Sequence, residues 1–246
     1  QFHATTKRQV AIVAPTGTAA LNAGGVTIHS FFHFKPGIQP KEAAQIRPND
    51  PELFQKLESL VIDEASMVRA DLLDCVEAFL RRNGPRPGQP FGGVAIMLVG
   101  DLYQLEPVCP PEESLLLRHY SSPFFFSSSA YQESSAFDRD DFATVELTQP
   151  FRQREVHFLH ALDGVRDGSA TPEHLQLING RARFMSSQSI MDYFGEADAT
   201  MLTTHRDQVR SWNQKMLDIL PGKPESFAAL VSGNFPPDQF PAEQHL

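Results

Sequence analysis

The sequence is poor in cysteine, with only Cys75 and Cys109 among 246 residues. The two form no CxxC pair and have no histidine cluster nearby, so neither a disulfide framework nor a zinc site is indicated. No apolar run approaches the roughly 18 residues that a membrane span needs, and the first residues hold no apolar signal core. These absences favour a protein of a reducing compartment that is neither membrane-spanning nor visibly targeted.

Lysine is missing between Lys7 and Lys35. A phosphate loop of the Walker A type needs G-x-x-x-x-G-K-[ST], so the superficially similar segment from Val13 to Gly25 is not such a loop. That segment still offers backbone N–H groups and the hydroxyls of Thr16 and Thr18 at a predicted helix N-terminus. Such a geometry suits the backbone phosphates of a nucleic acid.

The length corresponds to between one and two domains, and 41% hydrophobic and 21% charged residues are typical of a soluble folded enzyme or binding domain. The net charge of −9 disfavours a nucleic-acid partner at first sight. The charge is unevenly distributed, however. Residues 1–50 hold five Lys/Arg against two Asp/Glu, a net +3, whereas residues 101–150 hold two against nine, a net −7. A local groove for a polyanion is therefore allowed, although not required.

Three short apolar runs predict strands: Val10 to Ala14, Leu60 to Ile62 and Val94 to Val99. Each is rich in β-branched residues without polar alternation, which is typical of strands buried on both faces of a parallel sheet. Small or acidic residues follow each run. Because ligands of open α/β sheets bind beyond the carboxyl ends of the strands, we expect an α/β fold with its chemistry at these three ends.

Between the second and third runs, apolar residues recur at helical spacing, namely Leu72, Leu73, Val76, Phe79 and Leu80. Asn83-Gly84-Pro85 ends this helix, so the segment predicts a β-α-β unit.

Further along, residues 145–147 and 200–204 are predicted strands, and helices are expected from about 155 to 166 and from 207 to 220. The last strand and helix resemble the opening of a second α/β unit. Residues 121–131, SSPFFFSSSAY, predict a buried aromatic plug.

The motif LVIDEAS places Asp63 and Glu64 directly after a buried strand. P-loop NTPases hold Mg²⁺ with a carboxylate at this position, and an adjacent Glu can orient and deprotonate the attacking water. The alternative is an acidic pair that caps the following helix. In LVGDLYQL, Gln104 follows the next strand, where it can reach the terminal phosphate of a nucleotide, although Gly100-Asp101 also predicts an ordinary turn.

Two more motifs carry candidate residues. In VTIHSFF, Thr27 and His29 can extend a phosphate-binding track. Phe31 and Phe32 can either stack on a nucleic acid or pack in the core, and we expect them in the core. In ELTQPFRQ, Arg152 shortly precedes the presumed second unit. An arginine there suits an arginine finger, although a surface salt bridge is the common alternative.

In this order, the motifs resemble the Pif family (petite integration frequency) of superfamily one DNA helicases, relatives of RecD. The resemblance runs through APTGTAA, TIHSFF, VIDEASMV, GDLYQLEPV, VELTQPFRQ and TTHRDQVRSWN and covers nearly the whole chain. It implies a RecA-like P-loop NTPase sheet with flanking helices over residues 1–197, with a small wedge subdomain inserted at about 33–56. It also implies the beginning of a second RecA-like domain at 198–246.

The resemblance further implies an ATP- and Mg²⁺-dependent helicase that moves 5′ to 3′ on single-stranded DNA, unwinds forked duplexes in repair, recombination or replication, and works as a monomer. Its location is the bacterial cytoplasm or nucleoid, or the eukaryotic nucleus or mitochondrion. Pro15, Thr16, Gly17, Thr27 and His29 then contact the single strand.

By the same resemblance, Asp63 and Glu64 serve Mg²⁺ and the attacking water, Gln104 senses the terminal phosphate, and Arg152 is the finger. Relatives carry a lysine-bearing phosphate loop before the APTG motif and a closing half of the second motor domain. Neither lies within this sequence, so we expect a fragment with little ATP turnover by itself. The alternatives are a non-catalytic nucleic-acid-binding module derived from a motor and, less well supported by the TIH element, a nucleotide-dependent switch or transporter ATPase.

Overall fold

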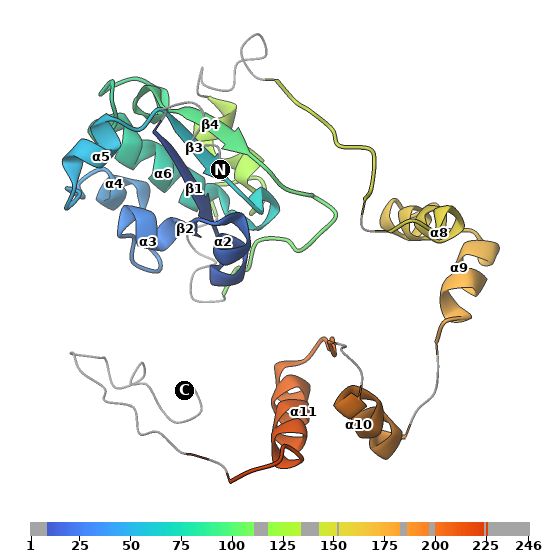
Figure 1. Ribbon diagram of the computed structural model, residues 1–246. Helices are drawn as coiled ribbons and strands as arrows, with labels where there is room; N and C mark the ends of the chain where they lie inside the picture. Colours follow the sequence, from blue (N-terminus) through green and yellow to red (C-terminus); the bar gives the residue numbers. More distant parts are fainter. Residues whose placement is uncertain are drawn as a thin grey trace. The chain divides into compact units, whose positions relative to one another are not determined.

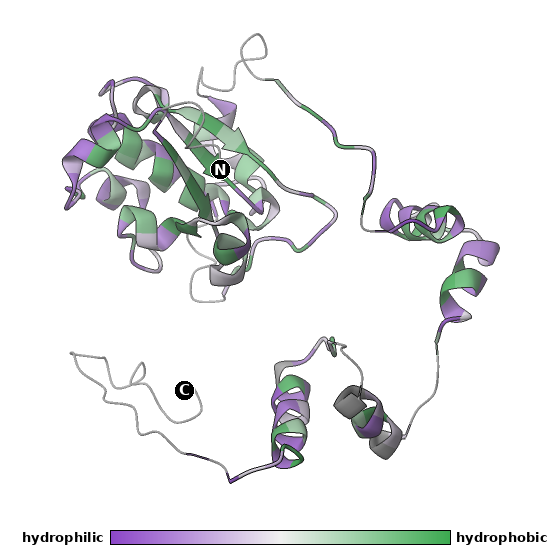
Figure 2. Cartoon of the chain, in the orientation of Figure 1, coloured by the Kyte–Doolittle hydropathy of each residue, from purple (hydrophilic) through white to green (hydrophobic). Residues whose placement is uncertain are grey.

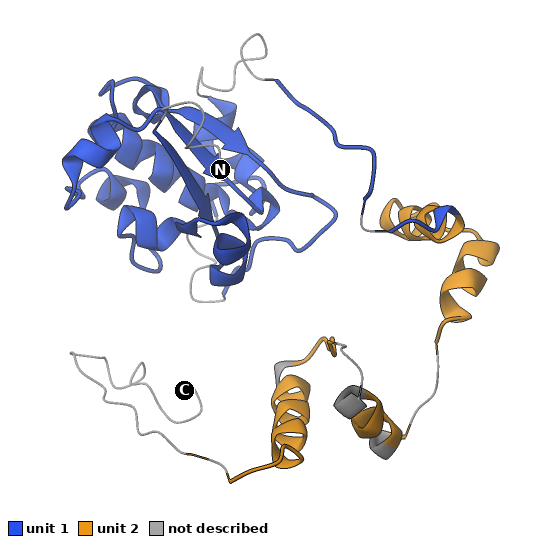
Figure 3. Cartoon of the chain, viewed as in Figure 1, with its two compact units in different colours: residues 1–156 blue, residues 157–246 orange. Residues whose placement is uncertain are grey.

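The structure is a computed structural model that describes residues 9–110, 118–133, 143–151, 153–182, 186–196, 200–223 and 225. The chain divides into two compact units, Gln1–Val156 and His157–Leu246 (Figure 3). No helix of the described residues is long and apolar enough to cross a membrane. The domain boundary expected at residue 197 remains a prediction.

The first unit contains a four-stranded sheet in the order β2-β1-β3-β4 with every neighbouring pair parallel (Figure 1). Its strands are β1 (Val10–Ala14), β2 (Val26–Thr27), β3 (Ser59–Ile62) and β4 (Ala95–Leu98). Val13 pairs with Ile62 and Ile62 with Leu98, so the three longer strands end nearly level. The predicted parallel α/β sheet and its three strands are therefore confirmed. The expectation that each strand is buried on both faces is wrong for β4, where Ala95 and Met97 are exposed because β4 is at the edge of the described sheet. The two-residue strand β2 was not predicted.

Short helices connect the strands, and α3 to α6 lie to one side of the sheet (Figure 1). They are α2 (Gly17–Ala23), α3 (Ile28–Phe32), α4 (Pro40–Ala43), α5 (Pro51–Gln55), η1 (Ala65–Met67), α6 (Ala70–Asn83) and η2 (Pro90–Gly93). The predicted helix is α6, and Gly84 follows it as expected. Acidic Asp71 in its first turn and Arg81 and Arg82 in its last turn complement the helix dipole.

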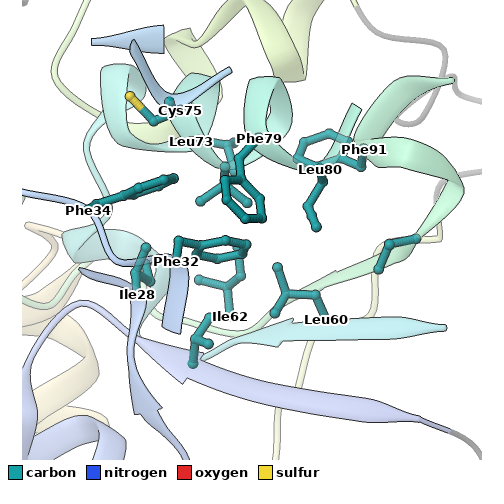
Figure 4. Close-up of a cluster of buried hydrophobic side chains, with 14 of the residues drawn as sticks. Ile28, Phe32, Phe34, Leu60, Ile62, Leu73, Cys75, Phe79, Leu80 and Phe91 are labelled. Carbon is teal, nitrogen blue, oxygen red and sulfur yellow. The ribbon is translucent and has the colours of Figure 1, made fainter. Parts of the chain in front are cut away.

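A cluster of phenylalanines fills the space between α6 and the sheet. Phe32 packs edge-on against Phe79 with ring centroids 5.2 Å apart, and Phe54 packs against the same ring at 4.9 Å. Figure 4 shows Phe32 between Phe79 and the inward-facing strand residues Leu60 and Ile62. Hydrophobic residues also run along the strands in Figure 2. Phe31 packs against this core, so the expectation that both phenylalanines of the TIHSFF motif are core residues is confirmed.

The segment 33–56 belongs to the same core. Phe34, Ala43 and Phe54 are each at most 5% exposed and pack in the cluster that contains Phe79. The Arg82 guanidinium on α6 also donates to the carbonyl oxygen of Ala44 at 2.9 Å. The segment is therefore anchored to α6, and its role as a wedge at a duplex fork remains a prediction.

The segment 118–133 packs against the first turns of α6 through η4 (Phe125–Ser127) and α7 (Ser129–Gln132). Asp74 accepts hydrogen bonds from the Tyr120 hydroxyl at 2.7 Å and from the Ala130 N–H at 2.7 Å. The predicted aromatic plug is only partly right. Phe124 to Phe126 are half-buried, whereas Ser127 and Ser128 are buried.

The regular elements in the described residues of the second unit are helices. The first of them, α8, begins at Val156, one residue before the boundary of this unit. The helices are α8 (Val156–Arg166), α9 (Pro172–Asn179), α10 (Ser187–Glu196) and α11 (Arg206–Asp218). The predicted helices at 155–166 and 207–220 correspond to α8 and α11.

The strands predicted at 145–147 and 200–204 are wrong. Val145 is 79% exposed, and Leu147 and Leu202 are each 90% exposed. Both stretches have no strand pairing in the part of the chain that the structure describes. A β-branched composition forms a strand only where a neighbouring strand supplies packing and hydrogen bonds.

Candidate functional site

The carboxyl ends of β1, β3 and β4 bring three candidate segments to one edge of the sheet. Pro15 and Thr16 follow β1, Asp63 follows β3, and Gly100 lies two residues after β4. The Asp63 N–H donates to the carbonyl oxygen of Val13 at 2.9 Å, so the ladder continues one residue beyond β3. This edge is where ligands bind in open α/β sheets.

Asp63 and Glu64 form a tight turn at this edge. The Glu64 N–H donates to the Asp63 Oδ1 at 3.0 Å, and Glu64 has left-handed backbone angles, φ 50° and ψ 44°. A non-glycine residue in that region costs about 1 kcal/mol or more, so surrounding contacts must hold it there. The neighbouring Ala65 N–H provides one such contact by donating to the Val99 carbonyl oxygen at 2.8 Å.

The acidic pair does not cap α6. The N-cap of α6 is Arg69, and the Glu64 side chain makes no capping hydrogen bond to η1. Both carboxylates are half-buried at the sheet edge. The described residues hold no cluster of three or more acidic, His or Cys ligands. The two adjacent carboxylates would fit a Mg²⁺ ion that arrives with phosphate oxygens and water, because such ions need only one or two protein carboxylates.

Gly100 brings the loop after β4 against the Asp63–Glu64 turn. A Cβ atom at this position would lie 3.0 Å from the backbone nitrogens of both Ala65 and Ser66. Glycine is therefore needed for the close approach rather than for an unusual dihedral angle. The Ser66 hydroxyl is buried in this contact region and is the one buried side-chain polar atom without a hydrogen-bond partner among the described residues.

Gln104 lies in the turn that Asp101 organises. The Gln104 N–H donates to the Asp101 carbonyl oxygen at 3.0 Å, and the Gln104 Nε2 donates to the Asp101 Oδ2 at 3.3 Å. The Asp101 Oδ1 also accepts from the Tyr103 N–H at 3.0 Å. The turn alternative is thus present, and it places an exposed Gln104 side chain on the loop that follows β4. Asp101, which the sequence indicated as part of a turn, is the residue whose side chain shapes this loop.

A groove of about 380 Å³ lies beside the end of β1. Its lining residues are Pro15, Thr16, His29, Pro36, Gly37, Ile38, Met67, Arg69, Asp71, Leu72, Val108 and Pro110. Three of the five candidate DNA contacts therefore meet in one groove, whereas Gly17 and Thr27 are not part of its lining.

Thr16 and Thr27 each cap a helix. The Thr16 Oγ1 accepts from the Ala19 N–H at 3.2 Å, and the Thr27 Oγ1 accepts from the Ser30 N–H at 3.2 Å. A threonine hydroxyl is one donor as well as an acceptor, so capping leaves its O–H to donate. Both threonines are half-buried.

Arg69 and Asp71 are the charged groove residues that sequence reasoning missed. The Arg69 Nε donates to the Asp71 Oδ1 at 2.9 Å and its Nη2 to the Oδ2 at 2.6 Å. The two side chains are only 13% and 5% exposed. No motif or spacing in the sequence marks this pair. Arg152, the candidate finger, lies outside the described residues.

Known proteins match most of this chain in sequence and in structure. A family model described as PIF1-like helicase matches residues 2–171. The ATP-dependent DNA helicase PIF1 of Emericella nidulans is 33% identical over 238 residues, which cover 94% of this chain and 29% of the relative.

Solved structures agree with this match. The crystal structure of Bacteroides Pif1 bound to single-stranded DNA is 31% identical with a TM-score of 0.77, and the match covers 98% of this chain and 54% of that one. A Bacteroides Pif1 complex with ADP-AlF3 and single-stranded DNA is 32% identical with a TM-score of 0.77, covering 97% and 53% of the two chains. The chain thus spans less than a third of the curated relative and about half of the solved chains. With a RecA-like sheet and a family match over most of its length, the chain belongs to the PIF1-like helicase family.

Proposed function

We propose that this chain supplies the first motor unit of an ATP-dependent DNA helicase. In this proposal the complete protein moves 5′ to 3′ along single-stranded DNA as a monomer and unwinds forked duplexes during repair, recombination or replication. The observation that carries the proposal is the placement of Asp63 and Glu64 beside the loop of Gln104 at the carboxyl edge of a parallel sheet.

In this proposal the two carboxylates at the sheet edge have different roles. Asp63 would hold Mg²⁺ through its carboxylate, and Mg²⁺ bound with ATP supplies positive charge against the phosphate oxygens. Glu64 would orient a water molecule and accept its proton as the water attacks. The left-handed backbone of Glu64 supports this role, because strained residues concentrate at functional sites.

Gln104 and Arg152 complete the proposed ATPase centre. Gln104 follows β4 on an exposed loop, from which its amide would reach the terminal phosphate. Arg152 would stabilise the charge that develops on that phosphate in the transition state. Loss of the arginine should accordingly lower turnover far more than ATP affinity.

The DNA track would run from Pro15 to His29. Two observations support it: Pro15, Thr16 and His29 share one groove, and residues 1–50 carry a net charge of +3 in an acidic chain. Hydroxyl and backbone N–H donors can hold phosphates without many lysines or arginines. Gly17 at the first turn of α2 and the capping Thr27 would extend the same track.

The test replaces Glu64 with Gln in the complete protein encoded by the gene. ATP hydrolysis is measured with and without a single-stranded oligonucleotide, alongside nucleotide binding. We expect Glu64→Gln to keep nucleotide binding and to lower turnover by about 10²-fold or more, because the general base is lost. Wild-type protein that binds the oligonucleotide without hydrolysing ATP would instead establish the alternative, a non-catalytic nucleic-acid-binding module. Near-normal turnover in the variant would show that another residue acts as the general base.

A further inference from the structure

Three arginines lie where α6 ends. Arg81 and Arg82 belong to its last turn, and Arg86 lies in the loop between α6 and η2. Because α6 follows β3 and precedes the parallel strand β4, this end of the helix lies at the amino edge of the sheet. The Asp63–Glu64 turn lies at the carboxyl edge. The three arginines, here called the arginine patch, are therefore at the opposite edge from the candidate ATPase residues.

Backbone carbonyl oxygens fix the direction of each guanidinium. All three arginines donate to one: Arg81 to that of Gly88 at 3.0 Å, Arg82 to that of Ala44 at 2.9 Å and Arg86 to that of Gly93 at 2.5 Å. A guanidinium carries five N–H donors in a planar fork, so each keeps donors that the backbone does not use. All three residues are exposed. The patch therefore presents oriented donors to solvent, which lowers the entropic cost of binding a ligand.

The patch keeps most of its positive charge. The Arg81 guanidinium is paired with the Glu77 carboxylate at 2.6 Å, whereas Arg82 and Arg86 have no carboxylate partner among the described residues. The sequence from 78 to 100 contains no Asp or Glu. In a chain with a net charge of −9, such a surface favours an anionic ligand.

The neighbouring surface does not neutralise the patch. The Asn83 Nδ2 donates to the Ile46 carbonyl oxygen at 3.2 Å, which brings the segment of the exposed Arg47 to the end of α6. Glu58 precedes β3 at the same edge of the sheet, and it forms no ion pair with these arginines in the part of the chain that the structure describes. Positive charge therefore prevails at the end of α6.

The patch offers no apolar surface beside its charges. Residues 44–47 and 78–94, all of them described, include no large hydrophobic side chain that is exposed. Single-strand sites stack bases on aromatic side chains, and protein interfaces anchor apolar side chains. A duplex instead keeps its bases inside and presents one phosphate charge per about 1.7 Å of its axis. A surface of guanidinium groups alone therefore suits a duplex best.

We propose that the arginine patch binds the phosphate backbone of double-stranded DNA. The inference goes beyond the proposed function, which places no DNA at this edge of the sheet, and takes from it only that the nucleic acid is DNA. Arg82 and Arg86 donate paired N–H groups to phosphate oxygens, the geometry in which arginine binds phosphate most strongly. Such contacts carry no sequence information. The first unit thereby holds a duplex at a surface separate from the groove beside β1.

The experiment measures binding of the 246-residue chain to a blunt DNA duplex and to a single strand of the same length, by fluorescence anisotropy at several salt concentrations. Arg82→Gln combined with Arg86→Gln should weaken duplex binding about tenfold or more. The slope of log affinity against log salt concentration should become shallower by about 2, because two phosphate contacts are lost. Single-strand binding should be unchanged. Arg118→Gln combined with Arg154→Gln is the matched control, because it removes the same charge from two exposed arginines outside the patch.

A second pair of substitutions separates charge from loop anchoring. Arg82→Lys combined with Arg86→Lys keeps both charges but replaces the guanidinium groups that hold Ala44 and Gly93. This variant should retain the salt slope and most of the duplex affinity. An equal loss in the Lys and Gln variants would show that the loss comes from the loop, and would overturn the proposal. If circular dichroism shows that the Gln variant does not fold, Arg86→Gln alone should make the slope shallower by about 1.

The remaining outcomes are equally decisive. Unchanged duplex binding in the Gln variant, or an equal loss in the control, overturns the duplex site. An equal loss of single-strand binding also overturns it, because the arginines then belong to the single-strand path. A wild-type chain that binds an oligoglutamate peptide through Arg82 and Arg86, but no duplex, has an acidic protein partner at this surface instead. A wild-type chain that binds the duplex through the patch but no single strand supports this inference and contradicts the single-strand track, so the two proposals fail separately.

Discussion

The Ala65 N–H donates to the Val99 carbonyl oxygen at 2.8 Å, so the loop after β3 and the loop after β4 are joined by a backbone hydrogen bond. Glu64 immediately precedes this bond, and Gly100 immediately follows it. A displacement of the Gly100–Gln104 segment therefore acts directly on the backbone that holds the Glu64 carboxylate.

Gly100→Ala should disturb this junction. The added Cβ would lie 3.0 Å from the backbone nitrogens of Ala65 and Ser66, which are parts of a loop that cannot rotate away as a side chain can. We expect a loss of about 1–3 kcal/mol in the free energy of unfolding, together with lower ATP turnover in the complete protein. Chemical denaturation measures the first effect. Gly17→Ala is the stability control, because no heavy atom lies within 4 Å of its Cβ position, and equal losses in both variants would contradict the prediction.

Thr16 needs a substitution that separates capping from DNA contact. Thr16→Ala removes the oxygen that accepts from the Ala19 N–H, which should cost about 1 kcal/mol of stability. Thr16→Asn keeps a capping acceptor and removes the hydroxyl. Combined with His29→Ala, it should weaken single-strand binding about equally for different base sequences, because phosphate contacts carry no sequence information.

Anisotropy titrations at two salt concentrations check the Thr16 prediction, with a shallow salt dependence expected because few cations are involved. Unchanged affinity in the folded double variant would remove the groove residues from the DNA path.

Two buried serines should respond in opposite directions to alanine. The Ser66 hydroxyl is buried without a partner, so Ser66→Ala removes an unsatisfied polar group and should leave stability unchanged or raise it by about 1 kcal/mol. The Ser128 hydroxyl accepts from the Tyr131 N–H at 3.1 Å and caps α7, so Ser128→Ala should lower stability by about 1 kcal/mol. Equilibrium unfolding of both variants provides the measurement. A large destabilisation by Ser66→Ala would reveal a partner for this hydroxyl.

Tyr120 should make the first unit sensitive to alkali. Burial, together with the hydrogen bond to Asp74, raises the pKa of Tyr120 above its ordinary value of 10.0. The folded state therefore keeps a proton that the unfolded state releases, so the contribution of Tyr120 is complete below pH 10 and declines as the pH rises above it. Tyr120→Phe should flatten this decline and cost about 1–2 kcal/mol at neutral pH, because Asp74 loses a donor. The measurement is the free energy of unfolding as a function of pH. An equally steep decline in the variant would exclude Tyr120 as the source of the decline.

Much of the sheet follows from local sequence. The runs in β1, β3 and β4 are apolar and β-branched, and the spacing of Leu73, Val76 and Leu80 fixes α6. Strand β2 has only two residues, too few for any periodicity. The runs at 145–147 and 200–204 contain β-branched and apolar residues, but strand formation depends on a neighbour that local sequence does not specify.

The candidate site, like the sheet, could be predicted only in part from the sequence. Asp63 and Glu64 follow a recognisable buried strand, so their position at the sheet edge could be predicted. The groove could not be predicted, because Ile38, Met67 and Leu72 come from a turn, a 3-10 helix and a long helix that meet only through tertiary packing. The ion pair between Arg69 and Asp71 could not be predicted either, because it stands out only through the burial of both side chains, and sequence alone does not show burial.

The hydrogen bonds to Asp74 also determine which stretch of the chain can be isolated as a folded piece. Its donors on Tyr120 and Ala130 lie 46 and 56 positions along the chain. A polypeptide that stops before Tyr120 would retain all four strands and α6, yet it would leave a buried carboxylate without either donor. The smallest autonomous form of the first unit therefore extends through Ala130, and limited proteolysis should release no stable fragment that ends before that residue.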